Sequence, residues 1–143
     1  MNVENEKCVI IVDESQPLGI IANTTAILGI TMGMKKPDVV GNDVLDSDKN
    51  LHMGIIQFPV PILKGDTEIL KSIRTKLYEP QFSELSELTV VDFTDLAQGC
   101  KTYDEFTGKM AITSETELKY IGIAICGNKK QVNKLTGNLP LLR

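Results

Sequence analysis

Near the N-terminus, the stretch from Lys7 to Gly33 limits the fold more than any other part of the chain. It begins with five consecutive apolar residues, most of them β-branched, from Cys8 to Val12. Such a run is typical of a strand that is covered on both faces. A polar corner follows from Asp13 to Gln16, and Pro17 then suits the first turn of a helix, where its missing N–H is no loss. The sequence therefore predicts a buried strand that leads through a corner into a helix.

The predicted helix extends from Pro17 to Gly33, and apolar side chains occupy most of its circumference. A helix that is apolar on nearly all sides is normally buried, so we expect this one to be largely buried. Its N-terminal cap is expected at Ser15 or Gln16, and Gly33 is expected to end it. Its polar exceptions are Asn23, Thr24 and Thr25.

Strand and helix patterns alternate along the rest of the chain. They predict strands over residues 88–93 and 120–126, and helices over 67–78, 104–110 and 129–135, with caps at Asp66 and Asn128. Two short β-prone runs between Val39 and Ile56 predict a hairpin, and two prolines place the extended segment Phe58–Leu63 at a sheet edge. No repeat or linker divides the 143 residues. We therefore predict one α/β domain over residues 1–143, with a small mixed sheet flanked by helices.

The composition narrows the functions that need to be considered. A net charge of −4 and an isoelectric point near 5.0 argue against a nucleic-acid partner, because phosphate affinity depends on clustered Lys and Arg. The start MNVENEKC is too acidic and polar for a signal peptide, and we expect no membrane span, so the cytoplasm is the expected location. Cys8 and Cys126 are expected in the core. Cys100 is the one candidate for a reactive thiol, although an inert surface cysteine is the favoured interpretation.

Two segments carry a resemblance to a known family. They are QPLGIIANT at residues 16–24 and VNKLTGNLPLLR at residues 132–143. Together with the strand Cys8–Val12 they resemble an uncharacterised bacterial family catalogued as domain of unknown function two thousand, and the resemblance covers nearly the whole chain. More distantly, the order of elements is similar to that of the archaeal and eukaryotic type of peptidyl-tRNA hydrolase. That resemblance implies the hydrolase's fold, a mixed sheet flanked by helices, and a homodimer.

The chain departs from this hydrolase where the enzyme has basic residues. The hydrolase carries a lysine near the start of its first helix and a histidine further along it, whereas the segments 19–21 and 26–27 of this chain hold only Gly, Ile and Ala. The hydrolase's catalytic aspartate corresponds to Asp92 or Asp95. Without the basic groups, such a carboxylate has no cation beside it to hold a phosphate or a developing oxyanion. The resemblance therefore does not carry the activity to this chain, and the catalytic residues stay unassigned.

The corner between the first strand and the helix is the predicted ligand site. Free N–H groups at a helix start bind anions, and Asn23 could orient an amide or hydroxyl of a ligand. In the alternative interpretation, Ser15 caps the helix and Asn23 satisfies neighbouring backbone groups. The predicted ligand-binding residues are Asp13, Ser15, Gly19, Asn23, Thr24 and Thr25.

Two further motifs lie in the predicted hairpin. His52 is the one histidine, and a nearby aspartate could make it a general base, although a structurally bonded surface histidine is the favoured interpretation. The pattern Asp46-x-Asp48-x-Asn50 resembles the opening of a calcium loop, but Leu51 occupies the position of the required glycine. A turn explains it better, so no metal site and no cofactor is predicted.

Three hypotheses for the function follow from the sequence. The first is a small-ligand-binding or regulatory domain on a hydrolase-like fold that lacks the hydrolase's lysine and histidine. The second is a hydrolase or transferase that acts on peptidyl-tRNA or a small substrate. The third is a structural homodimer with a vestigial pocket. Whether the chain is an enzyme is left open by the sequence.

Overall fold

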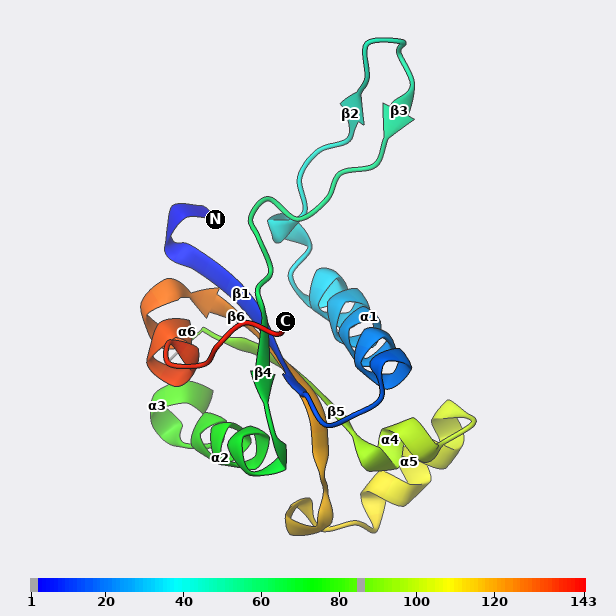
Figure 1. Ribbon diagram of the computed structural model, residues 1–143, viewed down its shortest axis with the longest axis vertical. Coiled ribbons are helices and arrows are strands. Elements are labelled where there is room, and N and C mark those ends of the chain that lie inside the picture. Colours follow the sequence, from blue (N-terminus) through cyan, green and yellow to red (C-terminus); the bar gives the residue numbers. More distant parts are fainter. Residues whose placement is uncertain (1–2, 85–86) are drawn as a thin grey trace.

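A four-stranded mixed sheet forms the centre of the computed structural model, which describes residues 3–84 and 87–143 (Figure 1). In space the strands follow the order β4-β1-β6-β5. β1 pairs in parallel with β4 and antiparallel with β6, and β5 pairs antiparallel with β6. The four strands are β1 (Glu6–Asp13), β4 (Ile62–Gly65), β5 (Thr89–Thr94) and β6 (Tyr120–Asn128). The predicted mixed sheet flanked by helices is confirmed.

Helices cover both faces of this sheet (Figure 1). One face of the sheet carries α1 (Leu18–Lys35). The helices α4 and α5 come directly after β5 in the chain and lie beyond the end of that strand. The other face carries α2 (Thr67–Leu77) with α3 and α6. The shorter elements are α3 (Pro80–Ser83), α4 (Asp95–Gly99), α5 (Tyr103–Ala111), α6 (Lys129–Thr136), η1 (Val3–Asn5), η2 (Pro37–Val39) and η3 (Glu115–Glu117).

The two central strands bury side chains on both sides. Along β1, Val9 and Ile11 face the α2 side, whereas Ile10 and Val12 face the α1 side. Successive side chains of a strand point to opposite faces, so a strand with a layer on each face is apolar throughout. The predicted strand between two layers is therefore confirmed, and the core consists of two clusters separated by the sheet.

Two helices begin at the side-chain caps that the sequence predicts. The carboxylate of Asp66 accepts a hydrogen bond from the backbone N–H of Ile69 at 2.8 Å. At α6, the side-chain oxygen of Asn128 accepts from the backbone N–H groups of Lys130 and Gln131. These bonds satisfy N–H groups that a helix leaves unpaired at its first turn. The proline-containing segment leads into β4, which lies at the sheet edge as expected.

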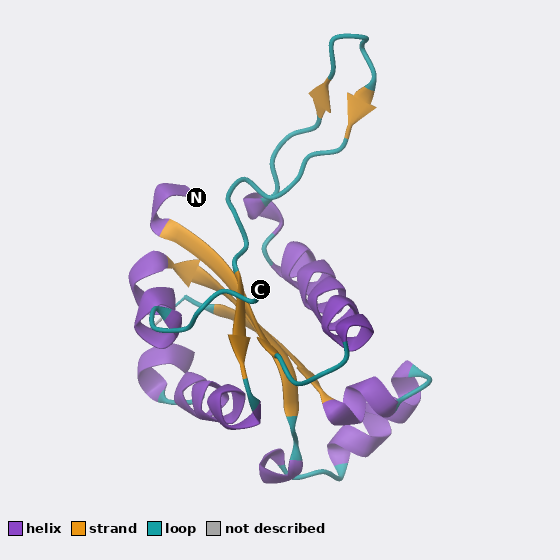
Figure 2. Ribbon diagram, in the orientation of Figure 1, coloured by secondary structure: helices purple, strands orange, loops and turns teal. Residues whose placement is uncertain are grey.

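The predicted hairpin is present and stands away from the rest of the molecule (Figure 2). It comprises β2 (Val44–Leu45) and β3 (Leu51–His52), which pair with each other in a sheet of their own. At its tip, a carboxylate oxygen of Asp46 accepts from the backbone N–H groups of two later turn residues, at 2.9 and 3.0 Å. The interpretation of this segment as a turn is thus confirmed.

The expectation that α1 is largely buried is wrong. Its four buried residues form one stripe against the sheet, and the opposite side faces solvent. A sheet contacts only one side of a helix that packs on it. A helix that is apolar on all sides is therefore not buried on all sides unless other elements of the chain pack against it as well. The exposed side includes Leu18, Ile30 and Met34, which are 82, 75 and 76% exposed. The buried stripe consists of Ile21, Thr24, Leu28 and Met32.

The ends and composition of α1 also differ from expectation. Pro17 occupies the cap position without a side-chain hydrogen bond, so neither Ser15 nor Gln16 caps the helix, and the helix continues past Gly33 to Lys35. By length and composition alone α1 could cross a membrane, and 22% of it is buried; the core helix of a globular protein meets the same criteria, so the expectation of no membrane span stays a prediction.

Candidate functional site

The corner after β1 is closed by its own aspartate. Asp13 is 3% exposed, and one of its carboxylate oxygens accepts from the backbone N–H of Ser15 at 3.0 Å and from its hydroxyl at 2.7 Å. The other oxygen accepts from the side-chain amide of Gln16 at 3.2 Å. The aspartate therefore holds the turn together, because its acceptor oxygens are occupied within the corner.

The remaining predicted ligand residues are spread around α1. Asn23 lies exposed, with its amide 3.4 Å from the side-chain oxygen of Gln98. Thr24 is fully buried, and its hydroxyl donates to the backbone oxygen of Ile20 at 2.7 Å. Thr25 donates to the backbone oxygen one turn earlier. Gly19 is exposed in the first turn. Of the six predicted residues, Thr25 alone lines the cavity described next.

An apolar cavity of about 520 Å³ lies between α1, the base of the hairpin and the sheet. Gly29 and Gly33 form part of its α1 wall, and a Cβ on either glycine would meet no atom within 4 Å. Glycine inside a helix costs about 1 kcal/mol relative to alanine. Neither a turn nor a close contact requires glycine at these two positions. The consequence of having no side chain there is a wider cavity.

The other walls of the cavity come from segments far apart in the sequence. The hairpin base contributes Val39, Val40, Ile55 and Ile56, and the sheet contributes Ile10 and Ile62. Two backbone hydrogen bonds, from Gly41 to Ile55 and from Gln57 to Val39, join the two legs of the hairpin at this base. None of the residues that line this cavity is charged.

Cys8 also lines the cavity and pairs across the strands with Cys126. Both cysteines are free and buried, as predicted for core residues. The hydrogen bond to the Cys126 sulfur, together with burial, raises the pKa of the Cys8 thiol well above its usual range. Cys8 is therefore a neutral thiol at the cavity wall and behaves as an apolar group.

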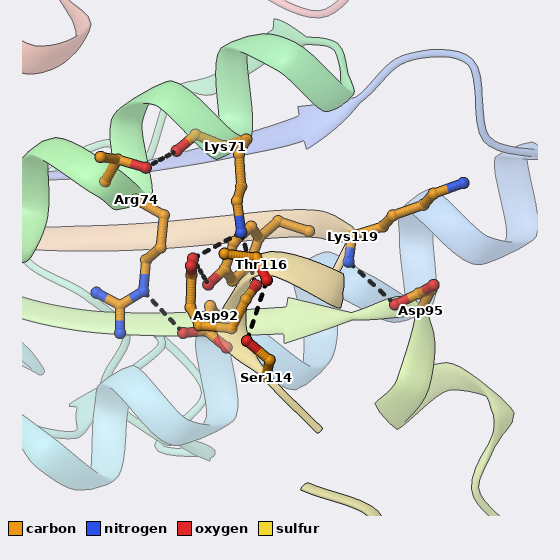
Figure 3. A network of polar contacts seen from close by, with 10 residues as sticks. Lys71, Arg74, Asp92, Asp95, Ser114, Thr116 and Lys119 are labelled. Carbon is orange, nitrogen blue, oxygen red and sulfur yellow. Dashed lines mark hydrogen bonds and ion pairs between the residues drawn. The ribbon is translucent and has the colours of Figure 1, made fainter. Parts of the chain in front are cut away.

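A charged cluster lies on the opposite face of the sheet, between α2 and β5 (Figure 3). The Nε atom of Arg74 lies 3.0 Å from a carboxylate oxygen of Asp92, and both side chains are mostly buried. The two groups form an ion pair but are not aligned as a hydrogen bond. The guanidinium also stacks over the ring of Tyr78 at 4.2 Å. Asp92 thus has a cation beside it, which the sequence analysis did not anticipate.

A second part of this cluster connects α2 to η3. The ammonium of Lys71 donates to the carboxylate and to the backbone oxygen of Glu115, each at 2.7 Å. The hydroxyl of Tyr120 donates to the same carboxylate at 2.9 Å. Chiefly through the Lys71 hydrogen bond, the pKa of Glu115 is lowered, whereas burial raises the pKa of Tyr120. Every polar group of this trio therefore has a partner within the chain.

The two remaining candidate residues lie apart from the cavity. His52 is exposed on the hairpin, and its Nε2 lies 2.9 Å from a carboxylate oxygen of Asp46. This contact lowers the pKa of Asp46. Cys100 is half-buried, and its thiol donates to the backbone oxygen of Leu96. Within residues 3–84 and 87–143, no group of three or more His, Cys, Asp or Glu side chains is placed to hold a metal ion.

Comparisons with known proteins agree with this fold. The model of the family described as Protein of unknown function (DUF2000) matches residues 6–143. A search of curated proteins finds no match. Among solved structures, the chain is similar to the protein of unknown function Atu0240 from Agrobacterium tumefaciens strain C58, with a TM-score of 0.85 and 18% sequence identity. The alignment covers 97% of this chain and 98% of that one, and at this identity it shows a shared fold alone.

Proposed function

We propose a ligand-binding function for this chain, which belongs to the family described as Protein of unknown function (DUF2000). The bound molecule is small and apolar, and it occupies the cavity between α1 and the hairpin base. The observation that carries the proposal is the volume of about 520 Å³ combined with a lining of aliphatic side chains and glycines. Small-molecule sites are mostly apolar concavities of roughly 300–1,000 Å³.

The lining also restricts the chemistry of the ligand. No Asp, Glu, Lys, Arg or His lines the cavity. The cavity opens to solvent, since Val40 and Ile55 in its lining are 41 and 79% exposed, but an unpaired charge placed deeper, against the sheet, would lose its hydration without compensation. One polar side chain in the wall, Thr25, donates its proton to the helix backbone and keeps lone pairs that can accept a hydrogen bond. A neutral molecule with an aromatic ring or short aliphatic chain, and at most one or two donors, matches these walls.

The proposal is tested with a neutral fluorescent probe, N-phenyl-1-naphthylamine, titrated into the purified chain. Gly29→Leu places a side chain in the cavity, because a Cβ at that position meets open space. Gly108→Leu is the matched control, since Gly108 lies inside α5 with equally open surroundings but does not line the cavity. We expect Gly29→Leu to weaken probe binding at least tenfold, a change of about 1.4 kcal/mol, and Gly108→Leu to leave it unchanged.

Two outcomes contradict this function. In the first, the wild-type chain gives no saturable probe signal. In the second, both leucine variants change the affinity for the probe equally. A binding-dependent rise in melting temperature provides an independent readout, because a ligand at one hundred times its Kd stabilises the folded state by about 2.7 kcal/mol. Asn23→Ala in the same assay tests the corner hypothesis directly: loss of binding in that variant would favour the corner over the cavity.

A hydrolase is the second candidate function, and the Arg74–Asp92 pair favours it. The order of β1, corner, α1, β6 and α6, followed by Thr136-Gly137, supports a fold of the archaeal-type peptidyl-tRNA hydrolase kind. In that comparison the hydrolase's aspartate corresponds to Asp92 or Asp95, and Asp92 has a guanidinium 3.0 Å away. A cation beside a carboxylate can stabilise a developing oxyanion or hold a phosphate.

Cleavage of a model peptidyl-tRNA by the purified chain tests this second function. We expect turnover, if it depends on the charged cluster, to be lost in Asp92→Asn and retained in Asp95→Asn. Absence of turnover by the wild-type chain at high enzyme concentration would rule the hydrolase out and leave the binding function standing.

A further inference from the structure

Two neighbouring surfaces of the described chain expose large apolar side chains without a cover. The first is the outer face of α1, defined by Leu18, Ile30 and Met34, which are at least 75% exposed. Between them lie Gly19 and Ala22, also exposed. No charged residue occurs from Leu18 to Met34. A smooth, uncharged helix face permits the close approach of a second helix.

The second surface is the part of the hairpin beyond its cavity-lining base, where four apolar side chains are between 58 and 84% exposed. The hairpin extends beyond the C-terminal end of α1 and contacts no other strand of the described sheets (Figure 1). A two-stranded hairpin alone is marginally stable in water and gains stability when its apolar side chains pack against another surface. These side chains are Val44, Leu45, Leu51 and Met53.

We infer that a second copy of this chain covers the outer face of α1 and the hairpin. In this homodimer the hairpin of each protomer reaches across the interface onto its partner. The interaction surface goes beyond the proposed ligand site, because none of its seven large apolar residues lines the cavity. They are Leu18, Ile30 and Met34 of α1 together with the four hairpin residues.

The exposed area matches what a stable dimer buries. Complete burial of an aliphatic side chain removes about 100 Å² of apolar surface, so these seven, each mostly exposed, present about 500 Å². A standard interface buries about 800 Å² per partner, of which roughly 60% is apolar. Val44 pairs with His52 and points away from Leu45 and Leu51. The six side chains without it present about 440 Å², close to the apolar share of one side of such an interface.

A second copy fits this surface better than a lipid bilayer does. α1 packs its other side on the sheet through fully buried Leu28 and Thr24, so it cannot enter a bilayer as an isolated span. The hairpin also carries Asp43, Asp46 and Asp48, and the chain is acidic overall. Anionic lipid surfaces attract basic segments and repel acidic ones. A two-fold dimer, in contrast, places the uncharged outer face of α1 from one protomer against the same face of its partner.

Sedimentation equilibrium of the full chain over a concentration series is the test. We expect the wild type to have twice the chain mass of 15.7 kDa. Ile30→Glu on α1 and Met53→Glu on the hairpin each place a charge in the apolar interface, so each should weaken dimerisation at least about tenfold. Ile112→Glu is the matched control, because Ile112 is 87% exposed at the end of α5 and belongs to neither surface. It should leave the dimer intact.

Since the substituted side chains are exposed in the single chain, far-UV circular dichroism should show a native fold for all three variants. A monomeric wild type overturns the inference, as does equal weakening by Ile112→Glu. Flotation of the wild type with phosphatidylcholine and phosphatidylglycerol vesicles, lost in Ile30→Glu, would assign the surface to a membrane and overturn it as well. A dimer weakened by Ile30→Glu but not by Met53→Glu would refute the role of the hairpin.

Discussion

Gly122 lies where α1 comes closest to the sheet, so replacing it by alanine should loosen that contact. A Cβ at this position would lie 2.6 Å from the Thr24 methyl group, 3.0 Å from Leu28 Cδ1 and 3.3 Å from the backbone oxygen of Ile11. The first distance is far inside van der Waals contact, and the strand oxygen prevents the new methyl from moving away. Therefore α1 has to shift or Thr24 has to change its rotamer.

The expected cost of Gly122→Ala follows from two opposing contributions. Overpacking a core by one methyl group costs about 1–3 kcal/mol. The alanine recovers about 0.4–1 kcal/mol, because it reduces the freedom of the unfolded chain. We therefore expect a net loss of about 1–2 kcal/mol in the free energy of unfolding. Thr24→Ser removes the clashing methyl group and keeps the hydroxyl, so it should relieve part of that loss in the double variant.

Urea unfolding followed by circular dichroism, at one fixed protein concentration, measures these changes. A fixed concentration matters because the homodimer proposed above would make stability concentration-dependent. Gly108→Ala in α5 is the matched control: its Cβ meets nothing within 4 Å, so it should stabilise by about 0.5–1 kcal/mol. The packing argument is refuted if Gly122→Ala is neutral or stabilising, or if its effect simply adds to that of Thr24→Ser.

Three further expectations use the same measurement. Asp66→Ala removes the cap of α2 and should cost about 1 kcal/mol, whereas Asp66→Asn should cost less than half of that; equal losses would contradict the capping role. Asp13→Ala opens the closed corner and should cost about 1–3 kcal/mol, while exposed Asn23→Ala should stay within about 0.5 kcal/mol of wild type. Because Lys71 lowers the pKa of Glu115 from its ordinary value near 4.5, their pairing stabilises the fold above that pH and loses this effect as the pH falls through the lowered pKa. The wild type and Lys71→Gln should thus differ near neutral pH and converge in acid, and a constant difference would argue against the pairing.

Local signals in the sequence were sufficient for most of the fold. Asp66 and Asn128 mark helix starts because a cap bonds to N–H groups two or three residues away. The apolar run Cys8–Val12 marks a strand between two layers because both of its faces need cover. Information of this kind lies within a few residues, so no knowledge of distant segments is needed to use it.

The burial of α1 could not be predicted in this way. The composition of a helix shows that its surface is apolar. Which side of the helix is buried depends on which other helices and strands of the chain pack against it. Here one sheet face covers the stripe of Leu28 and leaves Ile30 in solvent. The ion pair of Arg74 with Asp92 was missed for a related reason, because α2 and β5 meet only in the folded chain.

The cavity had one local signal, the two glycines at positions 29 and 33, of which the sequence analysis used only Gly33, and that one only as a helix end. Gly29 and Gly33 lower the helix propensity of α1 at two positions where no turn follows. Two unexplained glycines on one side of a helix indicate that something approaches there or that space is kept open. The remaining walls, Val39 and Ile62 among them, come from segments that no sequence pattern brings together.

The position of β6 in the sheet has a consequence for protein synthesis. β6 lies between β1 and β5, yet it is the last strand to leave the ribosome. Until Tyr120–Asn128 has emerged, β1 has no neighbour on one side and presents an unpaired apolar edge. Partly made chains with such edges are prone to aggregate. A chain that stops before Tyr120 can still pair β1 with β4, but β5 has no strand to pair with, so β1 and β5 both present unpaired edges until β6 has been made.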